Sequence, residues 1–85
     1  MTVEERIENG VELPEIGYSP LEYELIKDER SGSWGLRCTM RATGESAAAE
    51  DVTTDRGEAR RILLLMAEGT VTPVSFFEVL YDLMP

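Results

Sequence analysis

The stretch Thr53–Pro73, TTDRGEARRILLLMAEGTVTP, decides the fold because it carries every feature of one complete helix. Its apolar residues recur at i, i+3, i+4 and i+7, the spacing of a single helical stripe: Ala59, Ile62, Leu63 and Met66. Thr54 or Asp55 can cap the start, and Asp55 is followed three residues later by Glu58, a variant of the capping box. Gly69 is expected to end the helix in a left-handed conformation. The rest of the chain is then expected to cover this stripe.

A second helix is predicted directly after the first. Thr72 is a favourable N-cap, and Pro73 suits the first position of a helix. The segment that follows carries a broad apolar side made of Phe76, Phe77, Leu80, Leu83 and Met84. Because the linker between the two helices is short, they are expected to form an antiparallel hairpin.

Two segments upstream alternate between apolar and polar residues, which is the period of a half-buried strand: residues 21–28, LEYELIKD, and residues 34–42, WGLRCTMRA. The buried face is expected to hold Leu21, Tyr23 and Leu25 from the first segment and Trp34, Leu36, Cys38, Met40 and Ala42 from the second. The opposite face places glutamates of the first segment beside arginines of the second, so it is expected to face water. Residues 47–52 predict a third, weaker strand because alanine is a poor strand former. The predicted fold class is α+β, a three-stranded antiparallel β-meander followed by an α-helical hairpin packed on one face (βββαα).

Residues 1–20 precede this domain and show no clear period. They are acidic, and Pro14, Gly17 and Pro20 interrupt any repeating pattern. The first interpretation is an acidic, flexible N-terminal arm over residues 1–20, followed by a single α+β domain over residues 21–85. The alternative is an extra strand or helix that docks on the domain through Val11, Leu13, Ile16 and Tyr18.

Length and charge limit the classes of function. Eighty-five residues allow one domain, and the net charge of −9 disfavours direct binding to nucleic acid or to an anionic membrane. No apolar run approaches the roughly 20 residues that span a bilayer, and the N-terminus lacks the apolar region of a secretory signal. Cys38 is the only cysteine, so no intramolecular disulfide can form, which fits a reducing compartment. A cytoplasmic protein is therefore expected.

The residue types needed for common catalytic chemistry are scarce. There is no histidine, the commonest general base and metal ligand, and no glycine-rich phosphate loop. The densest acidic group, Glu50, Asp51, Asp55 and Glu58, is explained by helix capping and the helix dipole, with a weak divalent-cation site as the alternative. We therefore expect no catalytic residue, no metal site and no cofactor. An enzyme is the least favoured class of function.

A few residues remain outside the predicted core. Leu64 lies well round the helix from the apolar stripe, Ile26 lies on the polar face of its strand, and Tyr81 lies on the polar side of the second helix. Single exposed apolar residues are common, but a contiguous patch marks an interface. The candidate partner surface therefore consists of Ile26, Leu64, Tyr81, Arg60 and Arg61. The exposed edge of the small sheet is a second route to binding.

Several short motifs from Tyr23 onward resemble a family of small uncharacterised bacterial proteins, a domain of unknown function. They are YELI at residues 23–26, GLR at residues 35–37, EDVTTDR at residues 50–56, VTP at residues 71–73 and the closing F-x-VL-x-DL pattern at residues 77–83. The resemblance leaves out the acidic arm. It implies strands, a cap, a linker and helices, and it implies no catalytic residue.

Two hypotheses of function follow. The first is a non-enzymatic protein-interaction or regulatory module that acts through its helical hairpin or sheet edge, with an unknown protein partner or a second copy as a homodimer. The second is an acidic mimic of nucleic acid that occupies a basic surface on its partner, for which the charge of −9 is the support. Salt should weaken binding by a mimic steeply and binding through an apolar interface only slightly.

Overall fold

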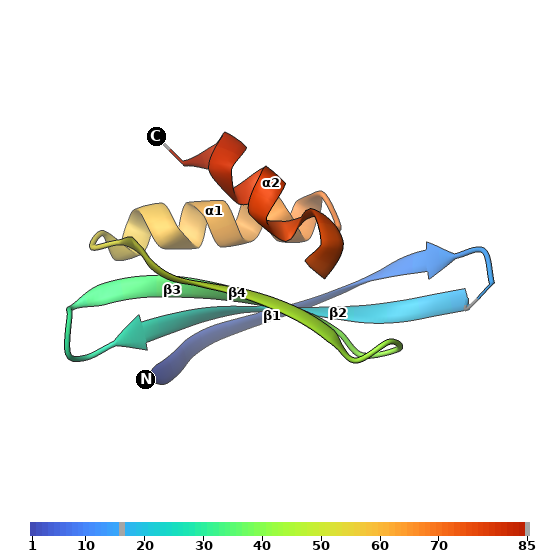
Figure 1. Cartoon of the computed structure of the whole chain (residues 1–85), viewed down its shortest axis with the longest axis horizontal. Helices are drawn as coiled ribbons and strands as arrows, with labels where there is room; N and C mark the ends of the chain where they lie inside the picture. The colour runs from blue at the N-terminus through green and yellow to red at the C-terminus, as the bar shows by residue number, and fades with distance from the viewer. Residues whose placement is uncertain (16, 85) are drawn as a thin grey trace.

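Four antiparallel strands form one sheet, and two helices lie on one face of it (Figure 1). This is a computed structural model, which describes residues 1–15 and 17–84. The strands are β1 (Thr2–Leu13), β2 (Gly17–Asp28), β3 (Ser33–Met40) and β4 (Glu45–Thr53), in the spatial order β1-β2-β3-β4. Helix α1 (Arg56–Glu68), the 3₁₀ turn η1 (Pro73–Ser75) and helix α2 (Phe76–Leu83) follow. The predicted α+β class is therefore confirmed.

The prediction of three strands is wrong, because residues expected to form an arm add a fourth. Strand β1 pairs antiparallel with β2, from Thr2 opposite Lys27 to Leu13 opposite Gly17. This is the docked strand that the sequence left as an alternative. Its residues Ile7, Val11 and Leu13 pack against the core. Ile16, which was expected to take part, lies outside the described residues.

The prolines that interrupt the pattern of residues 1–20 occupy positions that are compatible with strand pairing. Pro14 lies in the turn between β1 and β2. Pro20 lies in β2 opposite Gly10, beyond the point where the pairing with β3 ends at Leu21 opposite Met40. Proline lacks a backbone N–H, but on a side of the strand that has no neighbouring strand this costs the sheet no hydrogen bond. Prolines at these positions therefore permit the extra strand that the sequence left as an alternative.

The core lies between the sheet and the helices, as the two periodic patterns predicted. The apolar stripe of α1 is fully buried, and so is the alternating face of β2, with exposures of 0 % for Leu21, Tyr23 and Leu25. Met40 is the last residue of β3, so Ala42 lies in the following turn and is exposed. No helix in residues 1–15 or 17–84 has both the length and the apolar character needed to cross a bilayer.

Side chains from the sheet fix the end of α1. The Tyr23 hydroxyl and the Cys38 thiol both donate hydrogen bonds to the Val71 carbonyl, at 2.8 and 3.3 Å. Asn9 of β1 donates to the Ala67 carbonyl at 2.7 Å, satisfying an acceptor near the helix end. Burial raises the pKa of the Cys38 thiol to about 11, so the group remains a protonated donor at neutral pH. Cys38 is thus a buried core residue, as predicted.

The α1 terminus differs from the prediction in one position. Gly69 has φ −82°, whereas Thr70 takes the left-handed conformation with φ 48°. The Thr70 amide donates to the Ala67 carbonyl and the Val71 amide to the Met66 carbonyl, both at 3.1 Å, which is the Schellman pattern. Val71, the second residue after the cap, is buried, as is common for this position of a Schellman motif.

Thr70→Gly is accordingly expected to raise the free energy of unfolding by about 0.5–1 kcal/mol, since glycine adopts a left-handed conformation without strain. Gly69→Ala should not lower stability, because its φ is ordinary and an added Cβ would meet its nearest neighbour, the Leu65 carbonyl oxygen, at 3.5 Å. Urea denaturation of both variants checks this. A loss of stability in Gly69→Ala would show that Gly69, and not Thr70, is the left-handed residue.

Candidate protein-interaction site

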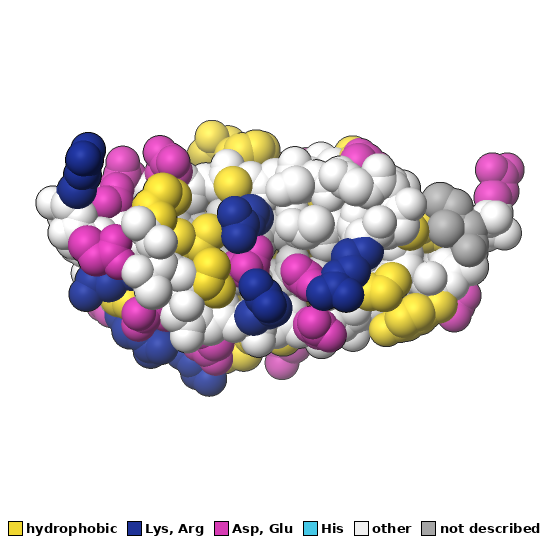
Figure 2. Space-filling model, turned by 90° about the horizontal axis from the view of Figure 1, so that it is seen from below, with side chains coloured by type: hydrophobic (Ala, Val, Ile, Leu, Met, Phe, Trp, Pro, Cys, Tyr) yellow, Lys and Arg dark blue, Asp and Glu magenta, His cyan; other side chains and the backbone are white. Residues whose placement is uncertain are grey.

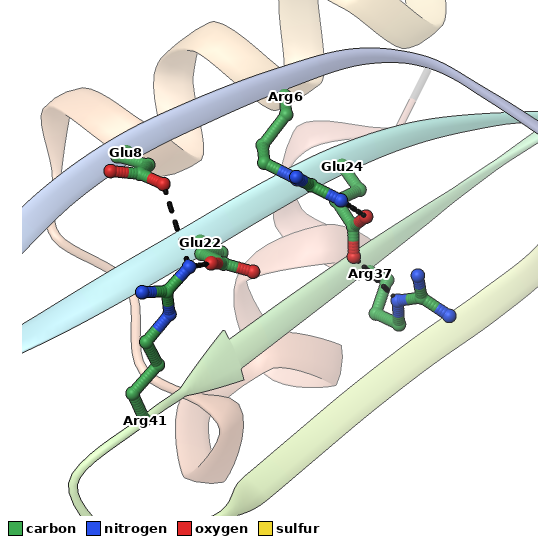
Figure 3. Close-up of polar contacts among 6 residues, drawn as sticks. All are labelled: Arg6, Glu8, Glu22, Glu24, Arg37 and Arg41. Atoms are coloured by element: carbon green, nitrogen blue, oxygen red, sulfur yellow. Dashed lines mark hydrogen bonds and ion pairs between the residues drawn. The ribbon is translucent and has the colours of Figure 1, made fainter.

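The sheet face opposite the helices is uncovered, and its acids and arginines are intermixed (Figure 2). Glu24 is only 3 % exposed and accepts hydrogen bonds from Arg37 at 2.7 Å and Arg6 at 3.1 Å (Figure 3). Next to this group, Arg41 forms ion pairs with Glu22 and with Glu8. The hydrogen bond from Arg37 is the main reason that the pKa of Glu24 is lowered. The arginines of this face are therefore engaged with neighbouring acids, as expected of a solvated surface.

Ile26 also lies on this uncovered face but is not exposed as predicted. Its exposure is 7 %, and it lines a hollow of about 190 Å³ together with Gly35 and Arg37. Gly35 permits close approach of β4, because a Cβ there would lie 2.5 Å from the Ala49 carbonyl oxygen. The hollow is lined by Met1 and by residues of β2, β3 and β4.

The five residues proposed as a partner surface do not form one patch. Leu64 is 37 % exposed on α1. Arg60 pairs with Glu5 of β1 at 3.0 Å, while Arg61 pairs with Glu58 and also donates to the Leu83 carbonyl. The two arginines thus tie α1 to different neighbours, and Ile26 lies on the far side of the sheet. Tyr81 is the member that adjoins a sizeable groove.

That groove lies between β4 and α2, which pack against each other (Figure 1). Its volume is about 490 Å³ and it is open to solvent. Exposed aromatic rings form its α2 side: Phe77 is 44 % and Tyr81 69 % exposed, with ring centroids 6.4 Å apart. The full lining is Ala48, Ala49, Glu50, Asp51, Val52, Phe77, Leu80, Tyr81 and Met84. We refer to these residues as the edge groove.

Helical spacing explains why α2 supplies two apolar faces. Phe76 and Leu80, four residues apart, are buried in the core. Phe77 and Tyr81, offset from these by one position, form a second stripe that lines the groove, and Met84, the residue after the last turn of α2, lines it too. The apolar pattern alone places Phe77 with Phe76 and Leu80 on one broad apolar side, whereas in the structure it belongs to a separate stripe. The offset of one residue was the signal that could have separated them.

Strand β4 is an edge strand, since β3 is its only neighbour in the sheet formed by the described residues. Its pairing with β3 is regular from Glu45 to Ala49 and is then shifted by a bulge. In the bulge, Asp51 has φ 52°, and its carboxylate accepts hydrogen bonds from the Ser31 and Ser33 hydroxyls. The bulge turns the chain toward the α1 cap, where Asp55 accepts from the Gly57 amide at 2.9 Å.

The two edges of the sheet are protected to different degrees. Natural edge strands avoid unwanted pairing through charged side chains and proline. Strand β1 carries charge along most of its length, as TVEERIENGVEL. Strand β4, ESAAAEDVT, has three consecutive uncharged alanines in its regular part. The β4 edge is therefore the more accessible of the two.

The rim of the edge groove is acidic. Glu50 and Asp51 line it, and Glu78 and Asp82 are exposed residues of α2 beside the aromatic pair. Within the described residues, none of these four carboxylates forms an ion pair, and the groove lining contains no lysine or arginine. The described part of the chain also contains no cluster of three or more potential metal ligands. The groove thus combines an apolar wall, a strand edge and uncompensated negative charge.

Comparison with known proteins identifies a family. No curated protein and no solved structure matched the chain. A family model described as a family of unknown function, DUF6514, matches residues 3–85. The match includes β1, which the resemblance seen in the sequence left out. The chain therefore belongs to the DUF6514 family of unknown function.

Proposed function

We propose that this protein is a non-enzymatic protein-interaction module that binds an extended segment of a partner in the edge groove. The observation that carries the proposal is the position of an accessible strand edge directly beside two exposed aromatic residues. Domains that recognise peptides by strand addition use this combination: main-chain hydrogen bonds give affinity and neighbouring side-chain pockets give specificity.

The aromatic pair supports binding more strongly than the other exposed apolar residues. Tyrosine and phenylalanine bury a large area at a small cost in conformational entropy, and aromatic residues are common among interface hot spots. Leu64 and Val74 are exposed too, but neither lines the edge groove. The uncovered sheet face is the weaker candidate, because a partner there would have to displace ion pairs that already satisfy its charges.

Selection of binding peptides from a random display library, followed by mapping of amide chemical shifts, tests the proposal. The selected peptides should shift amides in β4 and α2. Tyr81→Ala should weaken their binding about tenfold or more, as expected for an interface hot spot. Tyr18→Ala is the matched control, because Tyr18 is a similarly exposed tyrosine (62 %) outside the groove and should leave affinity unchanged. Peptides that map to the uncovered sheet face, or equal losses in the two variants, would contradict the proposal.

A further inference from the structure

We infer that the partner segment is an extended strand in which apolar residues alternate with lysine or arginine. This inference rests on the proposed function, because it assigns the chemistry of the segment that the edge groove would hold. Two features of the groove carry it: the two different faces that a strand added beside β4 would meet, and the uncompensated acids around it.

A strand added to β4 would place alternate side chains on opposite faces of the sheet. On the helix side they would meet the aromatic pair, Phe77 and Tyr81, and the partly buried Met84. On the other side they would lie next to Ala48, which is exposed and lies opposite Arg37 in the uncovered face. Apolar side chains of the added strand would match the aromatic residues on the helix side. On the opposite side there is room for long polar side chains that reach water.

Charge determines which polar side chains fit. Glu50 and Asp51 line the groove, Glu78 and Asp82 are exposed on α2 next in sequence to Phe77 and Tyr81, and none of the four has an ion-pair partner among the described residues. At the centre of the uncovered sheet face, by contrast, Glu22 and Glu24 already have arginine partners. A cationic segment would therefore gain favourable pairing at this edge, whereas an acidic segment would be repelled.

The same charges disfavour a second copy of this chain at the β4 edge. Two copies paired antiparallel about Ala48 would place Glu45 opposite Asp51 and Ser46 opposite Glu50. Like charges directly across a strand pair are destabilising, and each copy carries a net charge of −9. A basic partner strand thus fits this edge better than a homodimer does.

Three matched peptides of equal length test the inference in titrations with the full chain: alternating valine and lysine, alternating valine and glutamate, and alternating serine and lysine. The valine–lysine peptide should bind, and each of the others should bind about tenfold or more weakly. If valine–glutamate binds equally well in the groove, the basic partner is overturned while the proposed interaction function stands. If serine–lysine binds equally well, charge alone drives association. That result would favour the acidic-mimic hypothesis and overturn the alternating strand.

Charge variants locate the site of the effect. Glu50→Lys combined with Asp82→Lys should weaken valine–lysine binding about tenfold in about 150 mM salt, where distant charges are screened. Glu12→Lys combined with Glu15→Lys changes the net charge equally, at the far end of the β1–β2 hairpin, and should have less than about a twofold effect. Equal losses in the two double variants would show that only net charge matters and would overturn the inference. Sedimentation measures whether the free chain is a dimer. A dimer that becomes more stable in the Glu50→Lys, Asp82→Lys variant would assign the edge to a second copy and would also overturn the inference.

Discussion

Phe76→Ala is expected to lower the free energy of unfolding by about 3–5 kcal/mol, the range for truncating a buried phenylalanine. Phe76 is 0 % exposed and belongs to the core formed by the sheet and both helices. A domain of this size has a total stability of only about 5–10 kcal/mol. The variant should therefore be partly unfolded at modest urea concentrations.

Phe77→Ala provides the matched control, because it makes the same substitution at the next residue of α2. Phe77 is 44 % exposed, and its ring makes an edge contact with Phe76, with ring centroids 5.1 Å apart. Its cost should be about 1 kcal/mol or less. Urea denaturation curves with equal slopes measure both values. Equal costs would mean that Phe77 is a core residue and that the edge groove is filled in solution.

Glu24→Gln is expected to lower the free energy of unfolding by about 1–3 kcal/mol at neutral pH, because two charge-assisted hydrogen bonds to a buried carboxylate are weakened. The half-exposed arginine partners keep the cost below that of a fully buried pair. In the same test Glu8→Gln should cost little, since Glu8 is exposed and its pairing with Arg41 is long, at 3.6 Å.

The effect of Glu24 should depend on pH in a defined direction. Its pKa is lower in the folded protein than the ordinary value of about 4.3 for glutamate. The stabilisation is then fully present above that ordinary value and is lost as the pH falls toward the lowered pKa of the folded state. The difference between the native protein and Glu24→Gln should therefore shrink on acidification below about pH 4. Urea denaturation at a series of pH values measures this difference, and a gap that stays constant into the acid range would contradict the paired, ionised Glu24.

The sequence predicts an element well when its apolar residues follow one period and all lie on one buried face. The stripe of α1 and the alternation of β2 and β3 meet this condition. Strand β1 does not, because its inward positions include Glu5 and Asn9 among the apolar residues. Glu5 pairs with Arg60, and Asn9 donates to the Ala67 carbonyl. Both partners lie more than fifty residues away along the chain, so local sequence shows only polar residues that interrupt the pattern.

The candidate site illustrates a similar limit. The sequence suggested Tyr81 and a free sheet edge as two separate routes to a partner. Only the folded chain shows that Tyr81 and the β4 edge lie together, because α2 crosses back over the sheet and packs on β4. Ile26 and Leu64 met the same sequence criterion as Tyr81, an apolar residue outside the expected stripe. Their surroundings, and not their residue type, separate them from the edge groove.

Amide hydrogen exchange, measured with and without a saturating peptide of alternating valine and lysine, tests the central claim most directly. Amides of β4 that point away from β3 have no strand partner in the free protein and should exchange quickly. Strand addition should protect these amides in the regular segment Glu45–Ala49, while the outer edge of β1 keeps its exchange rates. Protection on β1, or binding that leaves the β4 amides unprotected, would contradict the assignment of the β4 edge and α2 as the binding site.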